Sequence, residues 1–136
     1  MNPILRNILA VLAGVVVGSA VNMGIIQISG SIIPPPEGVI PGDMESLKEN
    51  MPYFGPEQFV MPFLAHALGT LVGAWLAALL AASHQMKLAL GIGAWFLIGG
   101  VAVSFMLPAP LWFSAFDIIL AYLPMGWLGW KLAGSK

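Results

Sequence analysis

Residues 59–82 read FVMPFLAHALGTLVGAWLAALLAA, a run with no charged side chain and a single histidine, His66. A helix needs about 20 consecutive apolar residues to cross a hydrocarbon core that is roughly 30 Å thick. This run is long and apolar enough, and the nearest charges on either side are Glu57 and Lys87. The stretch therefore predicts a membrane-spanning helix, and it decides the class of the fold.

Three further apolar segments lie on either side of this run, and they predict spans at about 7–29, 88–107 and 111–131. The last one contains Asp117, and an aspartate costs about 3 kcal/mol at the centre of a membrane helix. The surrounding Leu, Ile and Phe residues each return about 0.3 to 0.6 kcal/mol and offset most of that cost. We therefore expect an all-α polytopic membrane protein, with residues 1–136 forming one domain of four transmembrane helices in an antiparallel bundle.

The composition excludes most other classes of protein. Of 136 residues, 59% are hydrophobic and only 8% are charged, whereas an ordinary soluble domain is about 25% charged. The net charge of -1 provides no basic surface for nucleic acid. The absence of cysteine removes disulfides, thiolate nucleophiles and Cys-ligated metal sites. The lipid bilayer is therefore the predicted partner, and no nucleic acid is expected.

The basic residues predict the orientation of the bundle. A four-pass arrangement places four of the five basic residues on one side of the membrane: Arg6, Lys87, Lys131 and Lys136. The positive-inside rule makes that side cytoplasmic, so both termini are expected in the cytoplasm. The loop of about residues 30–58 is then outside, and it carries one lysine, Lys48, against five acidic residues: Glu37, Asp43, Glu45, Glu49 and Glu57.

A secretory signal peptide is the competing interpretation of the N-terminal segment. Arg6, the apolar run and the small residues 18–20 resemble such a peptide and its cleavage site. The apolar run continues through Ile33, which is too long for an ordinary signal peptide. We therefore expect a retained transmembrane helix.

The outer loop contains a predicted short surface helix. Consecutive prolines at 34–36 lack N–H donors and favour an extended chain, so the first helix must end there. Asp43 is a suitable N-cap for a helix through Asn50, with apolar residues spaced along one face at Met44, Leu47 and Met51. This helix could act as a lid, or it could simply cover the ends of the bundle.

Small residues recur at helical spacing in the predicted spans, where close packing drives helix association in lipid. The glycines of this kind are Gly14, Gly18, Gly69, Gly73, Gly93 and Gly100. Gly14 with Gly18 and Gly69 with Gly73 have the GxxxG spacing. Such stripes of small residues either close one bundle or join subunits of a homo-oligomer. Pro124 predicts a kink in the fourth helix, with a static shape or a hinge as its purpose.

Four polar residues are expected at one level in the outer half of the membrane. At about 1.5 Å per residue, Asn22, His66 and Asp117 lie ~10 Å deep and Ser104 lies ~5 Å deep. Asp117 and His66 are unfavourable against lipid, so we expect them to face inward and form a hydrogen bond or ion pair. Asn22 and Ser104 would extend this cluster, together with Tyr122 or Thr70. The cluster either binds a proton, ion or small solute or only fixes helix packing.

No enzyme motif accompanies the cluster. The sequence lacks H-E-x-x-H, G-x-S-x-G and a phosphate-binding glycine loop with lysine. We therefore expect no catalytic residue, no metal site and no cofactor. The first functional hypothesis is a transporter-like or channel-like protein that uses the His66/Asp117 cluster. The alternative is a non-transporting structural or accessory subunit in the membrane.

Four stretches of the sequence carry a resemblance to known proteins: VGSAVNMG (17–24), GSIIPPPEGV (30–39), FLAHALGTLVGA (63–74) and PLWFSAFDIILAYLPMGW (110–127). In these stretches the chain resembles a group of small, uncharacterised bacterial four-helix integral membrane proteins. The resemblance implies a bacterial origin and hence a location in the inner membrane. It implies no activity, because none is known for the group, and it assigns no role to any residue.

Overall fold

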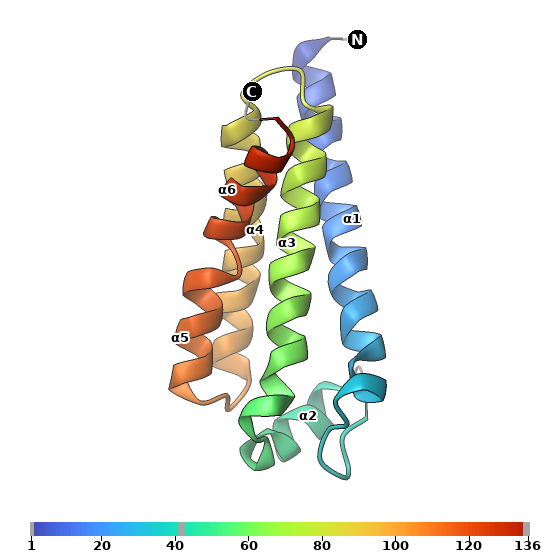
Figure 1. Cartoon of the computed structure of the whole chain (residues 1–136), viewed down its shortest axis with the longest axis vertical. Helices are drawn as coiled ribbons and strands as arrows, with labels where there is room; N and C mark the ends of the chain where they lie inside the picture. The colour runs from blue at the N-terminus through green and yellow to red at the C-terminus, as the bar shows by residue number, and fades with distance from the viewer. Residues whose placement is uncertain (1, 41–42, 135–136) are drawn as a thin grey trace.

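The computed structural model describes residues 2–40 and 43–134, and its secondary structure there is entirely helical. Within these residues, four helical stretches are long and apolar enough to cross a membrane: Pro3–Ile32, Pro56–Leu80, Gln85–Met106 and Leu111–Leu132. They pack antiparallel in one elongated bundle (Figure 1). The all-α class, the four long apolar helices and the antiparallel packing predicted from the sequence are confirmed.

Helix α1 (Pro3–Ile32) begins at a capped proline and ends just before the three consecutive prolines. The side chain of Asn2 accepts a hydrogen bond from the backbone N–H of Ile4 at 2.7 Å. The prolines at 34–36 have no backbone N–H to donate to a continuing helix, so the chain leaves the bundle there. Helix α1 packs along α3 (Val60–Leu80), and its contact with α4 (Gln85–Met106) is slight.

The loop that follows contains the expected short helix. Helix α2 (Met44–Asn50) is capped by Asp43, whose side chain accepts from the N–H of Glu45 at 3.1 Å. Two 3-10 turns, η1 (Met51–Tyr53) and η2 (Pro56–Phe59), lead into α3. The helix predicted after Asp43 is therefore confirmed, and it lies across the end of the bundle opposite the start of α1 and the end of α6, which we call the loop end (Figure 1).

The fourth apolar segment consists of two helices and not of one continuous helix. Helix α5 (Leu111–Leu120) and helix α6 (Leu123–Leu132) are separated at Ala121 and Tyr122. Pro124 lies in the first turn of α6, where its missing N–H costs nothing, whereas inside one long helix its ring would clash with the carbonyl of Leu120. The chain thus breaks just before the proline for which a kink was predicted.

The opposite end of the bundle is tightly packed. It holds the start of α1 and the end of α6, and we call it the terminal end. A methyl group built on Gly14 would lie 2.6 Å from the carbonyl oxygen of Gly73, and one on Gly129 would lie 2.7 Å from the backbone nitrogen of Trp75. Small side chains fill the same region, and they form a buried cluster of Ala74, Ala77, Ala78, Ala89 and Ile92. Backbones therefore approach closely here, and little space is left between α1, α3, α4 and α6.

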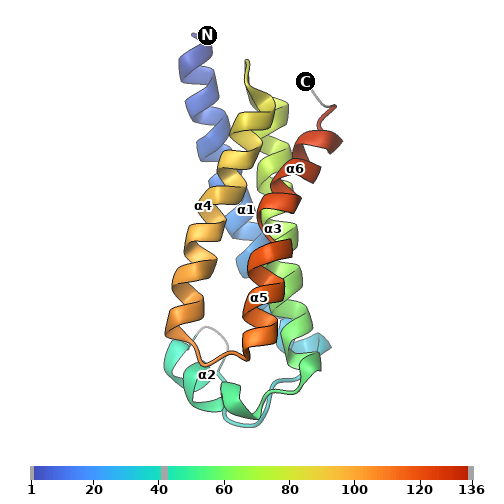
Figure 2. The same cartoon turned by 90° about the vertical axis from the view of Figure 1, so that its left-hand side faces the viewer.

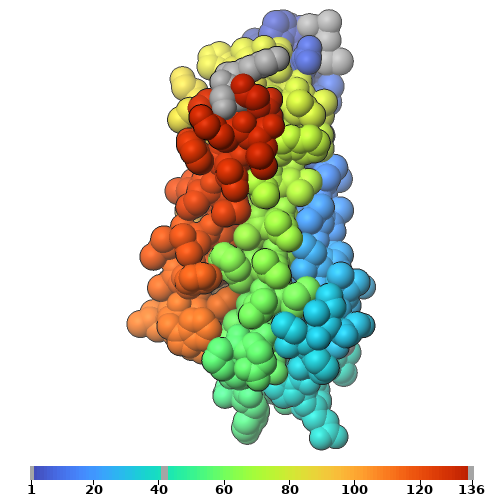
Figure 3. Space-filling view, viewed as in Figure 1, coloured from blue at the N-terminus to red at the C-terminus, as the bar shows by residue number. Residues whose placement is uncertain are grey.

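Helix α5 behaves differently from α6. The backbone of α6 lies close to both α3 and α4, whereas the backbone of α5 approaches its neighbours less closely. Aromatic rings bridge this distance, as Phe113 does with Phe59 and Phe116 with Phe63. Figure 2 shows α4 and α5 apart at the loop end, joined by residues 107–110, while α6 approaches its neighbours further up. In the space-filling view, α3 lies between α1 and the α5–α6 segment (Figure 3). The bundle is therefore closed at the terminal end and loosely packed at the loop end.

The glycine contacts give a stability prediction with a matched control in the same helix. Gly14→Ala places a methyl group against Gly73, and we expect it to lower the free energy of unfolding by about 1–3 kcal/mol. Gly24 has no atom within 4 Å of an added methyl group, so Gly24→Ala should be neutral or stabilising by up to ~1 kcal/mol. Unfolding in detergent micelles, followed by tryptophan fluorescence, measures both. Equal effects of the two variants would contradict the close approach of α1 and α3.

Candidate functional site

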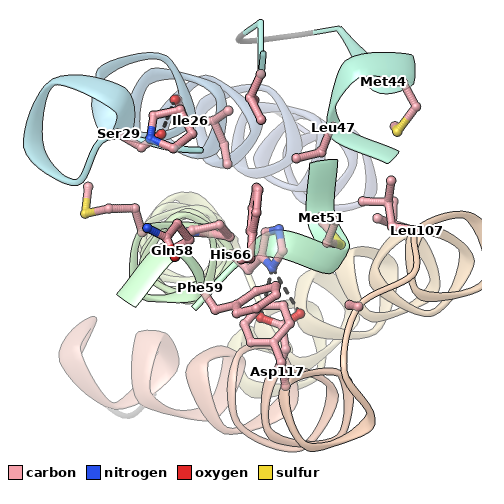
Figure 4. A pocket seen from close by; sticks show the side chains of 18 of the residues that line it. Ile26, Ser29, Met44, Leu47, Met51, Gln58, Phe59, His66, Leu107 and Asp117 are labelled. Carbon is pink, nitrogen blue, oxygen red and sulfur yellow. Dashed lines mark hydrogen bonds and ion pairs between the residues drawn. The ribbon is translucent and has the colours of Figure 1, made fainter. Parts of the chain in front are cut away.

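A cavity of about 360 Å³ occupies the loosely packed loop end. It is lined by α1, α3, α4, α5 and the loop that carries α2, and apolar side chains make up most of its wall (Figure 4). It extends from His66 and Asp117 to the exposed loop residues Ile40 and Asp43. The two ionisable side chains that the sequence places inside the spans therefore line a cavity that reaches the surface at the loop end.

His66 and Asp117 form a close pair. The Nδ1 atom of His66 lies 2.9 Å from Oδ1 and 3.0 Å from Oδ2 of Asp117. The hydroxyl group of Tyr122 donates to Oδ2 of Asp117 at 3.1 Å. Asp117 is 5% exposed, so its carboxylate is held by two donors and almost fully covered by protein.

The pair determines which nitrogen of His66 is available to a ligand. A carboxylate accepts hydrogen bonds, so Nδ1 carries the hydrogen and Nε2 is left with its lone pair when the ring is neutral. In the described part of the chain, no hydrogen bond joins Nε2 to another residue. The imidazole side chain is 25% exposed, and its second nitrogen points away from Asp117 (Figure 4). His66 thus presents a proton acceptor to the cavity.

A second, smaller cavity of about 220 Å³ meets the first at His66. Asn22 and Thr70 line it, and Gly99 and Phe96 form its wall on α4. Within the described residues, Oδ1 of Asn22 and Oγ1 of Thr70 are buried without a hydrogen-bond partner. An unsatisfied buried polar group costs about 1–3 kcal/mol. These atoms therefore mark a place suited to water or to a polar group of a ligand.

The expected network around the pair is only partly formed. Tyr122 joins Asp117 directly, whereas Ser104 and Asn22 do not bond to the pair. Ser104 donates to the carbonyl oxygen of Val101 at 2.7 Å, because a helical serine can bond to its own preceding turn. Ser104 lines the larger cavity and Asn22 the smaller one. Both residues thus lie near the pair without extending its hydrogen bonds.

Sequence reasoning gave little weight to Tyr122, and the break between α5 and α6 explains why. Five residues along a straight helix turn a side chain about 140° away, so Tyr122 would not face the partner of Asp117. The non-helical backbone at 121–122 redirects the ring, which stacks on His66 with centroids 6.0 Å apart. The same change brings its hydroxyl group against Gly100, where no larger residue would fit. The signal in the sequence was Pro124, which predicts the break.

In the described residues, no group of three or more His, Asp or Glu side chains could hold a metal ion. His66 and Asp117 provide at most two ligating groups.

Gly126 and Gly129, which the sequence analysis did not single out, face α4 and α3, where an added methyl group would meet backbone atoms. Their spacing of three residues on α6 was the available signal.

Comparisons with known proteins identify no family for this chain: no family model, no curated protein and no solved structure matches it. The chain is a four-helix protein with four candidate membrane spans. Its function must therefore be argued from its own residues.

A double-mutant cycle tests the central contact. Replacing His66 or Asp117 with alanine removes the same hydrogen bond, so the two effects on unfolding free energy should be non-additive by about 0.5–2 kcal/mol. The control cycle pairs His66→Ala with Ser104→Ala, and it should be additive within about 0.5 kcal/mol because Ser104 bonds within its own helix. Additivity in the first cycle would show that the pair contributes no coupling.

Proposed function

We propose that this chain is a small transporter-like membrane protein that binds a proton and a small solute at the His66–Asp117 pair. The observation that carries the proposal is the asymmetry of the bundle around that pair. A cavity of about 360 Å³ reaches it from the loop end, whereas close glycine contacts such as Gly14 with Gly73 fill the terminal end. This is the arrangement expected of a transporter open to one side.

The pair has the chemistry for coupling solute binding to protons. An ionised carboxylate inside a membrane must be compensated, and a proton on the adjacent imidazole would supply the compensating charge. Loss of that proton leaves the pair with a net negative charge in a low-dielectric region. Binding of a proton and binding of a positively charged solute are therefore alternatives at the same place.

The break before Pro124 supplies the moving part of the proposal. Helix α5 carries Asp117, and its backbone lies less close to its neighbours than that of α6, which is packed against α3 and α4. Rotation at Ala121 and Tyr122 would move the carboxylate while α6 stays in place. A hinge of this kind absorbs the change in a few backbone angles at the end of an element.

A structural role is the second candidate, and the observation in its favour is that Asp117 is already held by two donors. In that case the pair only fixes α5 against α3, and the cavity has no transported solute. The non-transporting alternative predicts a stable protein with no flux.

We expect the loop end to face the outside of a bacterial inner membrane, because Arg6, Lys87 and Lys131 lie at the terminal end. Lys136, the fourth basic residue used for this orientation, lies outside the described residues. A reporter that is active only in the cytoplasm, fused after Lys136, should therefore be active. A reporter inserted in the loop at Glu37 should be inactive. The reverse pattern would invert the orientation.

Proton flux in reconstituted vesicles tests the proposed function. Vesicles with an imposed pH gradient and an internal pH dye should equilibrate about tenfold faster with the wild-type protein than without protein, a ~1.4 kcal/mol change in barrier. Asp117→Asn and His66→Gln should remove this gain, because neither amide titrates.

Ser104→Ala is the control for that experiment, since Ser104 lines the cavity but bonds to its own helix. This variant should keep the wild-type rate. Thermal unfolding of every variant shows whether a lost flux reflects a lost fold. Wild-type vesicles no faster than empty ones, or full flux in both Asp117→Asn and His66→Gln, would refute the proposal.

A further inference from the structure

The ionisable side chains that line the two cavities around His66 include two carboxylates and no described lysine or arginine. The ionisable residues that line them are His66, Asp117, Asp43 and Tyr122. At the loop end the acidic residues of the loop outnumber Lys48. A cleft lined by one sign of charge concentrates solutes of the opposite sign. The cavity at the loop end therefore favours a cation.

The polar groups at the junction of the two cavities can accept hydrogen bonds from a ligand, and the unpartnered hydroxyl group of Thr70 can both accept and donate. Nε2 of His66 offers a lone pair, and Oδ1 of Asn22 is a buried acceptor with no partner in the described chain. The carboxylate of Asp117 lies directly behind the imidazole. An ammonium group carries several N–H donors and a positive charge, so it can satisfy these acceptors together. A hydroxyl group has a single donor and no charge.

The wall of the larger cavity requires an apolar body on the same ligand. Methionines contribute from α1, α2 and α3, and their flexible side chains adapt to ligands of different shape. Aromatic rings of Phe59 and Phe113 pack 4.5 Å apart beneath the loop. The volume of the larger cavity, about 360 Å³, lies within the usual range for small-molecule sites.

We infer that the solute of this site is an amphipathic amine: an organic monocation with at least one N–H donor and an apolar body that lies under the α2 loop. The inference rests on the proposed function and names its substrate class. The ammonium group lies against Nε2 of His66 and within reach of Asn22. The apolar body fills the larger cavity, so both parts of the ligand find matching surfaces.

Charge balance then links the amine to the proton. When the imidazole is protonated, the pair with Asp117 is neutral and Nε2 carries a hydrogen, so it cannot accept a hydrogen bond from an ammonium group. When the amine enters, the imidazole releases one proton to the water at the loop end, and the total charge inside the membrane stays the same. Asp117, Tyr122 and Asp43 are the other titratable groups that face this site. At this site one amine therefore displaces one proton.

Imidazole nitrogen NMR of the wild-type protein in lipid nanodiscs tests the inference, since the chain has two histidines. Four probes share a ten-carbon chain: decylammonium, decyltrimethylammonium, 1-decanol and decanoate. Decylammonium should shift the Nε2 signal of His66. His84, which is exposed in the turn before α4 at the terminal end, is the internal reference and should not respond.

The two cationic probes are the decisive comparison because they have the same charge and the same chain. Decyltrimethylammonium has no N–H donor, so its Kd should be about tenfold or more weaker, as expected for loss of a hydrogen bond to a charged group. Decanoate should give no shift, and 1-decanol should bind more weakly than decylammonium. Asn22→Ala should weaken decylammonium binding, whereas Gly24→Ala, on the same helix but outside both cavities, should not.

The outcomes separate this inference from the proposed function. Equal binding of the two cations, equal binding of decanol, preference for decanoate or no shift with any probe would overturn the substrate class. Proton flux that persists in those cases leaves the proposed function standing. A selective shift by decylammonium without proton flux supports the amine site and refutes transport.

Discussion

A carboxylate inside the hydrocarbon region must be compensated, and the rest of this structure depends on how Asp117 meets that constraint. A charged side chain facing lipid is expensive, so α5 has to turn Asp117 inward toward a donor. His66 on α3 and the hydroxyl group of Tyr122 provide the two donors. The contact ties α5 to α3. The break before Pro124 in turn allows Tyr122 to reach the carboxylate.

The two ends of the bundle use different ways of holding helices together. At the terminal end, glycine and alanine allow backbones to approach closely, and van der Waals contact holds the helices because apolar burial gives no net drive in lipid. The side chains of Arg6 and Asn7 add hydrogen bonds to the backbone of residues 80–83. At the loop end, aromatic rings and one polar pair join α5 to α3. The cavity lies at this end, where the side chains are larger and the backbones lie further apart.

Sequence patterns predicted the four spans, the helix after Asp43 and the contact between His66 and Asp117, because each follows from a strong local constraint. The length of an apolar run, the presence of an N-cap residue and the cost of a charge inside the membrane can all be read from the sequence without knowledge of the tertiary structure. The cavity could not be predicted in this way, because its volume depends on how far α5 stands from α4. Ser104 was placed at the correct depth, but its hydroxyl group had a closer acceptor in its own helix. Whether the glycines join helices or subunits likewise depends on tertiary structure, and Gly14 and Gly73 face one another within the chain.

The proposed cycle follows from combining the loosely packed α5 with the cost of its carboxylate. Moving α5 away from α3 while Asp117 is ionised would leave a charge without its donors, which is strongly unfavourable in lipid. The movement becomes accessible only when a proton or a bound cation neutralises that charge. Loose packing of α5 lowers the barrier to motion, and the pair sets the condition under which motion occurs. In the proposed function, the mobility of α5 and its buried pair with His66 act together to couple movement to charge.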